Sequence, residues 1–343
     1  MKDELIKKLL NALKEYESLG IADQIDYKKF YLYSLITHST AIEGSTVTEI
    51  ENQLLFDEGI TAKGRSLQEQ MMNLDLKVAY EHSMRLAHQH EEFSVEMLKS
   101  LFAIVMKNTG ARYNTAQGSF DASKGDLRLV GVTAGIGGRS YMNFQKVPAK
   151  LEEFCKQLNR RRSELSNLDD IIAKYLFSFD AHYQLVTIHP WVDGNGRMSR
   201  LVMNHLQYEF GLVPVKIFKE DKAEYIQALI DSREKESLEP FREFMVEEHI
   251  RNISKEIKEY KKSQENDLIK AVSDPIKSFS DPIKERLYQA VLKDGTLNYA
   301  EYAAIIGASE ATVKRRLGEL KKDGFIIRVG SNKTGHWEKN KEK

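Results

Sequence analysis

One twelve-residue segment limits the possible folds of this 343-residue chain more than any other part of it. The segment, His189–Arg200, reads His-Pro-Trp-Val-Asp-Gly-Asn-Gly-Arg-Met-Ser-Arg. Because a proline disfavours helical conformation in the residue before it, His189 is expected to begin a loop after a helix. The apolar pattern of residues 197–210 predicts a second, buried helix that Gly211 ends. The segment therefore requires two helices joined by a tight loop.

The loop has the residue types of an anion-binding site. The turn Gly194-Asn195-Gly196 leads into a helix, which points backbone N–H groups and the positive end of the helix dipole outward. Arg197 and Arg200 are three residues apart on one helix face, so both guanidiniums can reach the same anion. Asp193 offers the hard oxygen that Mg²⁺ prefers beside phosphates, and His189 can accept a proton. The pattern indicates phosphoryl or nucleotidyl transfer from a Mg-nucleotide.

The same segment resembles the signature of the Fic (filamentation induced by cAMP) family, His-Pro-Phe-x-Asp/Glu-Gly-Asn-Gly/Lys-Arg-x-x-Arg. Its one departure is Trp191 in place of phenylalanine, which keeps an aromatic anchor. The resemblance implies a protein adenylyltransferase, which transfers AMP from ATP to a Ser, Thr or Tyr hydroxyl. It also implies His189 as the base, Asp193 as the ligand of Mg²⁺, the Gly-Asn-Gly turn as the anion hole, and Arg197 and Arg200 as phosphate ligands.

A second motif, Ser39-Thr-Ala-Ile-Glu43-Gly44, is similar to the inhibitory motif Ser/Thr-x-x-x-Glu-Gly/Asn of many Fic proteins. In that family the glutamate pairs with the second signature arginine, here Arg200, and keeps the nucleotide γ-phosphate from binding productively. A carboxylate on Arg200 competes with phosphate for a bidentate partner. The motif precedes the signature, so the resemblance is to class II members. We therefore expect an autoinhibited enzyme that is weakly active or silent.

Between residues 108 and 147 the helical pattern stops and glycines become frequent. Two β-type runs, residues 127–132 and 140–144, flank Thr-Ala-Gly-Ile-Gly-Gly and predict a β-hairpin. No Gly-Lys-Ser/Thr follows, so the glycines do not form a phosphate loop. In the Fic family a hairpin here, the flap, adds a strand to the target segment. The resemblance assigns residues 127–143 to the flap, and an ordinary hairpin is the alternative. The docking residues would be Leu127, Arg128, Leu129, Val130, Gly131 and Val132.

Tyr225-Ile-Gln-Ala-Leu229 resembles a Tyr-x-x-Ala-Leu segment that borders the adenine pocket in Fic proteins. The resemblance makes Tyr225 a candidate nucleotide contact, although an aromatic residue on a helix is more often part of a core. His182, His205 and Asp180 lie within helical patterns and are interpreted as structural residues.

The last part of the chain has winged-helix spacing. Residues 252–281 form a charged, helical connector, and the pair Asp281-Pro282 is a good helix start. Three helices, residues 282–292, 299–306 and 310–322, precede two β-type runs that end near residue 338. Residues 310–328 contain six Lys/Arg and three Asp/Glu, which is compatible with DNA contact. Winged helices also bind proteins, so both interpretations stay open.

The remaining chain predicts a mainly α fold, a Fic-type helical bundle with a small β-hairpin flap, followed by a winged helix-turn-helix domain. Helices are expected at residues 2–18, 27–42, 48–57, from 66 onward, 94–106 and 149–158, with a charged turn at residues 160–164. The predicted domains are an N-terminal helical region (1–93, motif at 39–44), a catalytic core (94–251), a connector (252–281) and the winged helix (282–338).

Composition excludes several classes. Lys+Arg and Asp+Glu number 51 each, so no net charge favours nucleic acid or membrane. No stretch approaches the ~18 apolar residues of a membrane span, and no signal-peptide core is present. Cys155 is the only cysteine, which excludes an internal disulfide and a cysteine-based zinc site. We expect a cytoplasmic protein.

Several alternatives stay open at this point. Fic proteins also transfer UMP, phosphate or phosphocholine, although the kinase-like branch typically has Asn-Lys-Arg where this chain has Asn195-Gly196-Arg197. Glu43 could instead position water and remove AMP from a modified protein. The chain could also be a DNA-binding regulator. The sequence does not identify the target protein, which could be the chain itself, or the oligomeric state, a homodimer included.

Overall fold

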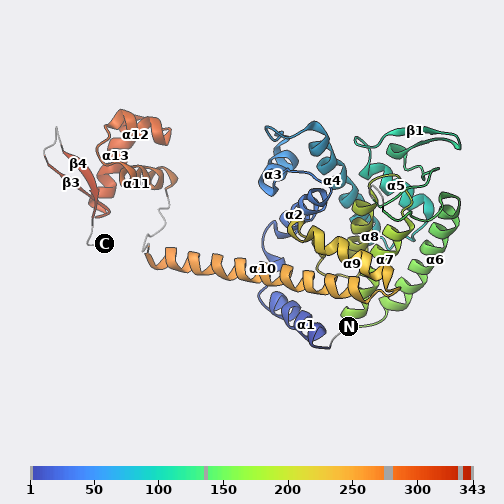
Figure 1. Ribbon diagram of the computed structural model, residues 1–343. Helices are drawn as coiled ribbons and strands as arrows, with labels where there is room; N and C mark the ends of the chain where they lie inside the picture. Colours follow the sequence, from blue (N-terminus) through green and yellow to red (C-terminus); the bar gives the residue numbers. More distant parts are fainter. Residues whose placement is uncertain (1–2, 135–137, 274–280, 331–334, 341–343) are drawn as a thin grey trace. The chain divides into compact units, whose positions relative to one another are not determined.

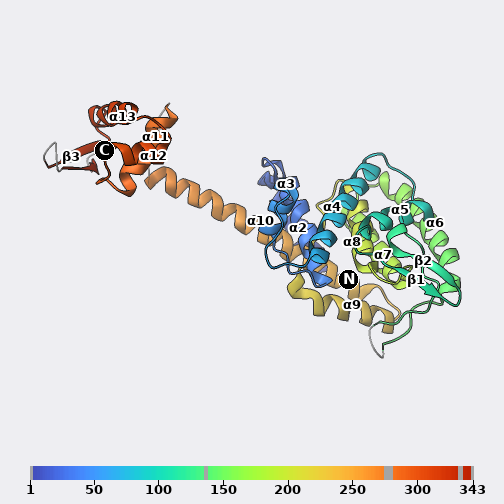
Figure 2. The ribbon, with the colours of Figure 1, turned by 90° about the horizontal axis from the view of Figure 1, so that it is seen from above.

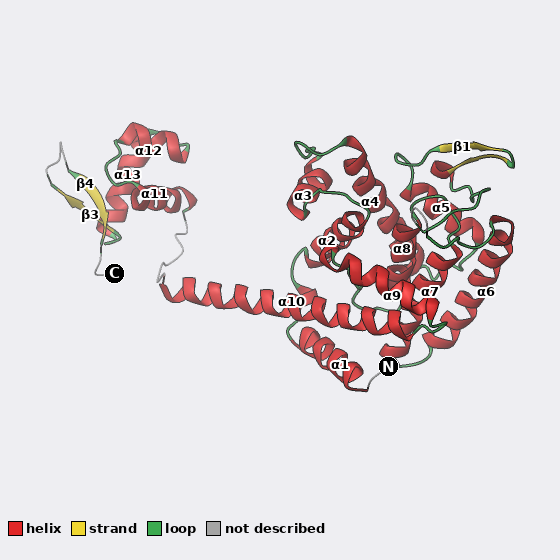
Figure 3. Ribbon diagram, in the orientation of Figure 1, coloured by secondary structure: helices red, strands yellow, loops and turns green. Residues whose placement is uncertain are grey.

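The computed structural model describes residues 3–134, 138–273, 281–330 and 335–340 (Figure 1). The chain divides into two compact units, residues 1–260 and 261–343. Most described residues are helical, and the strands are short (Figure 3). The predicted mainly α fold is therefore confirmed. No helix in the described ranges is long and apolar enough to cross a membrane.

The first unit is a helical bundle. The helices are capped largely as their sequences predict: Thr48 and Ser66 form capping boxes with Glu51 and Glu69, and Ser94 caps the fifth helix. The bounds are α1 Asp3–Ser18, α2 Tyr27–Ile42, α3 Glu49–Glu58, α4 Leu67–His88, α5 Val95–Val105, α6 Val147–Ser166, α7 Ile171–Ile188, α8 Asn195–Glu209, α9 Lys222–Glu234 and α10 Glu239–Ser273.

The helix α8 lies in the middle of this bundle, where it packs against α4, α5 and α7 (Figures 1 and 2). Nearly all of its residues are buried, as its apolar sequence predicts. Trp191, in the loop before it, is fully buried and stacks on Phe102 of α5 with ring centroids 4.0 Å apart. The aromatic anchor therefore ties the loop to the core on the α5 side.

One sequence prediction for this unit is wrong, and one pair of strands was not predicted. The charged run at residues 160–164 is not a turn but part of α6, because Glu164 pairs with Arg160 and Arg161 at helical spacing and Arg162 donates to the carbonyls of His90 and Glu91. The chain also contains a hairpin that was not predicted. Its strands are β1, Arg112–Thr115, and β2, Gly118–Asp121, paired antiparallel with Arg112 opposite Asp121.

The predicted flap hairpin forms only in part. Residues 127–132 and 140–144 contain no strand, and the two runs meet at a single bridge between Thr133 and Ser140. The amide of Tyr141 also donates to the Val132 carbonyl at 2.9 Å. The ladder does not continue because the amide of Arg128 donates to Pro190 instead of to a partner strand. Of the predicted turn, residues 133–138, the middle part at 135–137 lies outside the described residues.

The second unit contains three helices followed by a strand pair, as predicted. The helices are α11 Pro282–Lys293, α12 Tyr299–Ile306 and α13 Glu310–Lys322, and Asp281 caps α11 as expected. The strands β3, Ile326–Val329, and β4, His336–Lys339, pair antiparallel around a core that includes Trp337. The helix α10 begins in the first unit and runs through residue 273, so the predicted boundary between core and connector falls inside one helix.

Candidate active site

The loop between α7 and α8 begins at a residue with positive φ and is closed by hydrogen bonds from one side chain within it. His189 ends α7 in the left-handed region, with φ 51°, and its amide still donates to the Leu185 carbonyl. The Asn195 side chain closes the loop because its Oδ1 accepts from the Trp191 amide at 3.1 Å and its Nδ2 donates to the Trp191 carbonyl at 2.9 Å. Asn195 therefore shapes the loop with its side chain, which leaves its backbone N–H for an anion.

The start of α8 is open to an anion. Gly194 occupies the N-cap position with φ 76°, and no side chain caps the helix. The first-turn N–H groups have no acceptor within the helix, so they and the helix dipole attract negative charge. A Cβ on Gly194 would lie 2.7 Å from the Met106 Sδ, so only glycine fits between the loop and the core.

Arg197 and Arg200 both point their guanidiniums toward this helix start. Arg197 is 2% exposed, and its Nε and Nη1 have no hydrogen-bond partner among the described residues. Its Nη2 lies 3.7 Å from the Asp193 carboxylate. Burial lowers the pKa of the Arg197 guanidinium. A buried guanidinium with unpaired donors is a physical sign of a site that receives an anion.

Arg200 is already occupied. Its Nε donates to the Ser39 Oγ at 2.8 Å, and its Nη2 donates to the Ser39 carbonyl at 3.0 Å and to the Glu43 Oε1 at 2.5 Å. Partial burial acts to raise the pKa of Glu43, but the charge and hydrogen bond of Arg200 outweigh it and hold that pKa below its usual value. The structure thus brings together the three residues of the predicted inhibitory contact.

The Glu43 carboxylate also lies at the start of α8. A Cβ on Gly196 would be only 2.6 Å from the Glu43 Oε1, so Gly196 allows this close approach. The carboxylate therefore fills space beside the N–H groups that an anionic ligand would use.

His189 is held as a neutral base. Its Nδ1 lies 3.2 Å from the Val186 carbonyl, and because a carbonyl only accepts, Nδ1 carries the proton and Nε2 the lone pair. The ring stacks on Tyr141 with centroids 3.7 Å apart. Burial lowers the pKa of His189 to about 4, so the imidazole is neutral at physiological pH.

Asp193 is mostly exposed, with 65% of its side chain accessible. Its Oδ1 accepts from the Gly194 amide at 2.7 Å. No group of three or more His, Cys, Asp or Glu side chains able to hold a metal occurs in the described part of the chain. A Mg²⁺ ion at Asp193 would therefore complete its coordination with phosphate oxygens and water, as Mg²⁺ commonly does.

Comparison with known proteins agrees with this geometry. Residues 92–207 match the model of the Fic/DOC family, and residues 280–327 match the model of the winged helix-turn-helix DNA-binding family. The chain contains a Fic domain. The resemblance inferred from the sequence is confirmed for this domain and for the winged helix, whereas assignment to class II stays a prediction.

The Fic domain has curated relatives at low identity. The chain is 26% identical over 202 residues to protein adenylyltransferase fic-1 of Caenorhabditis elegans, covering 58% of this chain and 36% of that protein. It is 29% identical over 223 residues to protein adenylyltransferase Fic of Drosophila mojavensis, covering 64% of this chain and 40% of the relative. The chain thus matches less than half the length of these relatives.

Solved structures show the same fold. A Fic domain containing signaling protein from Bacteroides thetaiotaomicron aligns with TM-score 0.59 at 21% identity, covering 73% of this chain and 96% of that one. A Fic family protein from Desulfovibrio desulfuricans G20 aligns with TM-score 0.63 at 17% identity, covering 99% and 97%. At these identities the likeness establishes the fold alone.

The flap of the Fic domain differs from its sequence prediction at Arg128. This residue was predicted to dock a target, but it is 1% exposed. Its guanidinium donates to the carbonyls of His189, Val130 and Met142 at 2.7, 2.8 and 2.5 Å. Arg128 therefore braces the loop between α7 and α8 against the flap and is not available to a target. The other predicted docking residues are half-buried or exposed: Leu127, Leu129, Val130, Gly131 and Val132.

Tyr225 lies in the core, which is the alternative that the sequence left open beside a nucleotide contact. It is 3% exposed, and its hydroxyl lies 3.0 Å from the His182 Nε2 and interacts with Arg200. It therefore supports Arg200 from the core side. Its neighbours Ile226 and Leu229 instead line a pocket of about 720 Å³ between α7, α9 and the flap, which also includes Tyr141.

The structural interpretation of the three polar helix residues agrees with their contacts. His182 is fully buried against Tyr225, His205 lies 2.9 Å from the Ser83 Oγ, and Asp180 pairs with Arg242. Sequence reasoning missed Tyr141 and the bracing role of Arg128. Neither has a motif of its own, because each acts through contacts with residues about 50 to 60 positions away.

Proposed function

We propose that this chain is a protein adenylyltransferase that transfers AMP from ATP to a hydroxyl side chain of a protein, and that Glu43 restrains it. The observation that carries the proposal is the convergence of a neutral His189, the uncapped start of α8 and the unpaired donors of buried Arg197. These supply a base, an anion hole and a buried cation around one small space.

In the proposed reaction, the His189 Nε2 takes the proton of the target hydroxyl. The hydroxyl oxygen then forms a bond to the α-phosphorus of ATP, and the bond from that phosphorus to the bridging oxygen of pyrophosphate breaks. The N–H groups at the start of α8 and the Arg197 guanidinium stabilise the charge that develops on the phosphate. Asp193 would hold Mg²⁺, which neutralises phosphate charge when bound. Most of the catalysis is then positioning and charge stabilisation.

The pocket beside the flap supports a nucleotide substrate. It is largely apolar, and it includes Tyr141, which stacks on His189, together with Val186 and Ile226. A purine ring suits such a pocket because its faces are apolar and its edges can reach the few polar groups.

The contact between Glu43 and Arg200 supports restraint. Arg200 is 3% exposed, and its Nε and Nη2 donate hydrogen bonds to Ser39 and Glu43. A nucleotide γ-phosphate needs the same donors, so it must displace the carboxylate. We therefore propose that the resting enzyme binds ATP poorly or in an unproductive arrangement.

The test uses α-labelled ATP with Mg²⁺ and a cell lysate. Glu43→Gly should increase label transfer by about tenfold or more, because it removes a charge-assisted hydrogen bond worth roughly 1.5–3 kcal/mol. His189→Ala in the Glu43→Gly background should abolish transfer. No label on any protein in the Glu43→Gly form would exclude the transferase, and label that survives His189→Ala would exclude His189 as the base.

The same system tests whether Glu43 instead serves the removal of AMP from a modified protein. Protein labelled by Glu43→Gly is purified and returned to the wild type. If the wild type releases labelled AMP faster than a Glu43→Gly control does, Glu43 serves hydrolysis, and restraint is not its only role.

A second activity, DNA binding, is favoured by the match of residues 280–327 to a winged helix-turn-helix DNA-binding family. On α13, Lys314 and Arg315 are exposed, whereas Arg316 is paired with Asp281 and Glu319. We propose that Lys314 and Arg315 contact DNA. Replacing both by glutamate in the full chain should abolish salt-dependent binding of duplex DNA, while Lys150→Glu on α6 should not. Equal binding by all three proteins would exclude this surface.

A further inference from the structure

A buried polar network surrounds the segment that carries Glu43. Its five members, which we call the amide clamp, come from α2, the loop after it, α3 and α4. Each is at most 6% exposed, and none belongs to the signature: Thr37, Thr40, Ser45, Asn52 and Asn73. Burial of so many polar groups destabilises a fold unless they bond to one another, so the network must have a defined geometry.

Asn73, on α4, is the centre of the clamp. Its Oδ1 accepts from the Thr40 Oγ1 at 2.7 Å and from the Asn52 Nδ2 at 2.9 Å. Its Nδ2 donates to the Ser45 Oγ at 3.1 Å and to the Glu69 carbonyl at 2.8 Å. The amide thus uses both of its N–H donors and two acceptor positions.

The clamp bonds fall on both sides of Glu43. Thr40 precedes Glu43 by one helical turn, and Ser45 follows it by two residues. The main chain closes the same segment, because the amides of Glu43 and Ser45 both donate to the Thr40 carbonyl, at 3.0 and 3.1 Å. The side-chain amide of Asn73 on α4 therefore holds the backbone segment on both sides of Glu43.

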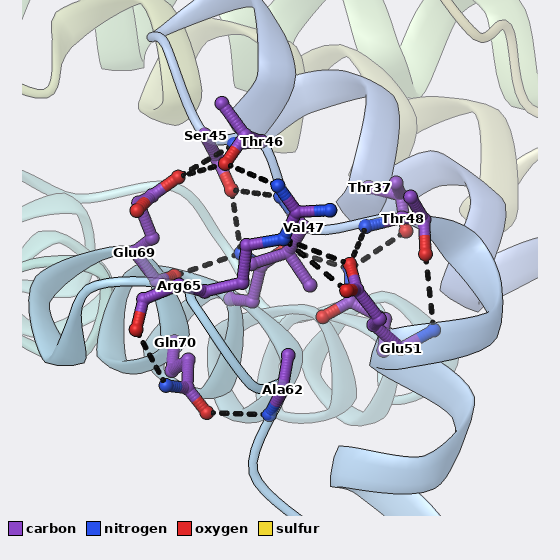
Figure 4. Close-up of polar contacts among 12 residues, drawn as sticks. Thr37, Ser45, Thr46, Val47, Thr48, Glu51, Ala62, Arg65, Glu69 and Gln70 are labelled. Atoms are coloured by element: carbon purple, nitrogen blue, oxygen red, sulfur yellow. Dashed lines mark hydrogen bonds and ion pairs between the residues drawn. The ribbon is translucent and has the colours of Figure 1, made fainter.

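Exposed contacts hold the loop that follows, as Figure 4 shows. The Glu69 carboxylate accepts from the Thr46 amide at 2.7 Å and from its hydroxyl at 2.6 Å. Arg65 donates from its Nη1 to the Thr46 Oγ1 at 3.1 Å and pairs through its Nε with Glu51. These contacts keep residues 45–48 on the first turn of α4, beside the clamp.

The helix α4 also holds the arginine side of the contact. The Tyr80 hydroxyl donates to the Asn204 Oδ1 at 2.7 Å, and Asn204 lies one turn after Arg200 on α8. Asn73 and Tyr80 are two turns apart, so they share a face of α4. One helix face thus sets the positions of both the Glu43 segment and the Arg200 helix.

We propose that Asn73 is a positioning residue that holds Glu43 on Arg200 through the amide clamp, and that loss of its amide bonds releases the restraint and activates the enzyme. This proposal rests on the restraint by Glu43 proposed above. Asn73 touches neither Arg200 nor the start of α8 in this scheme; it acts on the activity only through the position of the segment that contains residues 40–45.

The experiment compares wild type, Glu43→Gly, Asn73→Leu, the pair Thr40→Val with Ser45→Ala, and Asn73→Leu combined with Glu43→Gly. Two quantities are measured on the full chain: affinity for a non-hydrolysable ATP analogue with Mg²⁺ by calorimetry, and transfer of label from α-labelled ATP. Ser83→Ala is the matched control, because Ser83 is also buried on α4 and bonded to α8, but has no contact with the clamp.

Asn73→Leu and the Thr40/Ser45 pair should both raise nucleotide affinity and label transfer to within about threefold of Glu43→Gly, and Ser83→Ala should match wild type. The combined Asn73→Leu and Glu43→Gly variant should be no more active than Glu43→Gly alone, because both changes remove one interaction. A merely structural role of Asn73 would lower stability and activity together and would not raise affinity.

The outcomes separate the two proposals. If Glu43→Gly is active while both folded clamp variants behave as wild type, the role of Asn73 is refuted and the proposed restraint stands. If Glu43→Gly is no more active than wild type, both the proposed restraint by Glu43 and the proposed role of Asn73 are refuted. Should Asn73→Leu not fold, the Thr40/Ser45 pair decides the question alone.

Discussion

At the scale of single residues, the chemical properties of the candidate site come from burial and from specific hydrogen bonds. His189 is half-buried against Tyr141, Arg197 keeps unpaired donors in the interior, and Arg200 is shared between Ser39 and Glu43. Each property depends on a neighbour that excludes water or supplies a hydrogen bond. Substitution of these neighbours should therefore change the chemistry as well as the stability.

The first prediction concerns the acid limb of the transfer reaction. Because burial lowers the pKa of His189 to about 4, the base stays neutral, and the Glu43→Gly variant should keep most of its transfer rate down to pH 5. A solvent-exposed histidine would lose its rate near pH 6.5. The initial rate is measured from pH 4.5 to 8, with samples returned to pH 7.5 to verify reversibility. A midpoint near 6.5 would contradict the prediction.

The second prediction concerns Arg128. Arg128→Lys should lower kcat by about tenfold or more and change the KM for ATP much less, because an ammonium cannot bond to three carbonyls in the planar fork of a guanidinium. Steady-state kinetics in the Glu43→Gly background provide the measurement. Arg112→Lys, an exposed change on β1, is the control, and an equal loss in both variants would count against the bracing role.

The motif residues show what a sequence can predict at this scale. The pairing of Glu43 with Arg200 was expected from two motifs, and the two residues are 157 positions apart, whereas the bonds from Arg200 to Ser39 were not predicted. Arg128 was assigned to a target-docking surface, and Tyr225 was left open between a nucleotide contact and a core residue; both side chains are buried. A sequence pattern places a residue on an element but does not reveal burial by distant segments. The unpaired donors of Arg197 are also visible only in three dimensions.

At the scale of elements, glycine at the start of α8 is a requirement of both fold and site. Gly194 has φ 76°, and an added Cβ would meet the buried Met106 and Phe102. Those two side chains belong to the layer on which Trp191 stacks. A Cβ at Gly194 would therefore displace the side chain on which Trp191, the aromatic anchor of the loop, is stacked.

The third prediction compares the two glycines at the ends of α8. Gly211→Ala should lower the free energy of unfolding by about 1–2 kcal/mol, because Gly211 has φ 68°, which an L-residue adopts at that penalty. No steric penalty is added, since no atom lies near the position of its Cβ. Gly194→Ala should cost more, since the steric overlap adds to the same conformational penalty, and it should also impair transfer. Urea unfolding measures the stability of both variants. Equal losses would show that the core yields to the new Cβ.

Helix ends were predictable from the sequence, whereas strand pairing was not. Thr48, Ser66, Ser94 and Asp281 are caps as expected, because capping depends on residues three apart. The flap lacks its predicted ladder because its backbone and Arg128 bond to the catalytic loop. The pair β1–β2 has no apolar alternation to reveal it; its sequences, Arg-Tyr-Asn-Thr and Gly-Ser-Phe-Asp, are mostly polar.

At the scale of the whole molecule, burial lowers the pKa of four histidines in the first unit, of which three are buried and His189 is half-buried. Burial lowers the pKa of His182, His205 and His249 to about 3 and that of His189 to about 4. On unfolding, each imidazole regains a pKa near 6.5 and takes up a proton at lower pH. Stability is therefore intact above pH 6.5 and falls as the pH drops below it.

The fourth prediction follows from this count. Between pH 7 and pH 5 each buried histidine should lower the free energy of unfolding by about 2 kcal/mol. Glu248, whose pKa burial raises to about 7, opposes roughly one of them, because it binds a proton in the folded state. Urea unfolding at both pH values gives the measurement. Fluorescence of a Trp337→Phe variant restricts the signal to Trp191 in the first unit.

His249→Phe is the matched control, since neither ring nitrogen of His249 has a hydrogen-bond partner among the described residues. Between pH 7 and pH 5, the free energy of unfolding of the His249→Phe variant should fall by about 2 kcal/mol less than that of the protein with His249. An unchanged pH dependence would mean that His249 is not neutral and buried in solution.

The bond between Glu43 and Arg200 joins two parts of one chain, so its formation does not depend on the concentration of the protein. A tethered carboxylate faces Arg200 at an effective concentration on the order of millimolar or higher, however dilute the protein is. Neither dilution nor synthesis of more protein changes the fraction of molecules in which Glu43 is bonded to Arg200. A ligand or partner lowers that fraction when it binds preferentially to molecules in which Arg200 is free of Glu43.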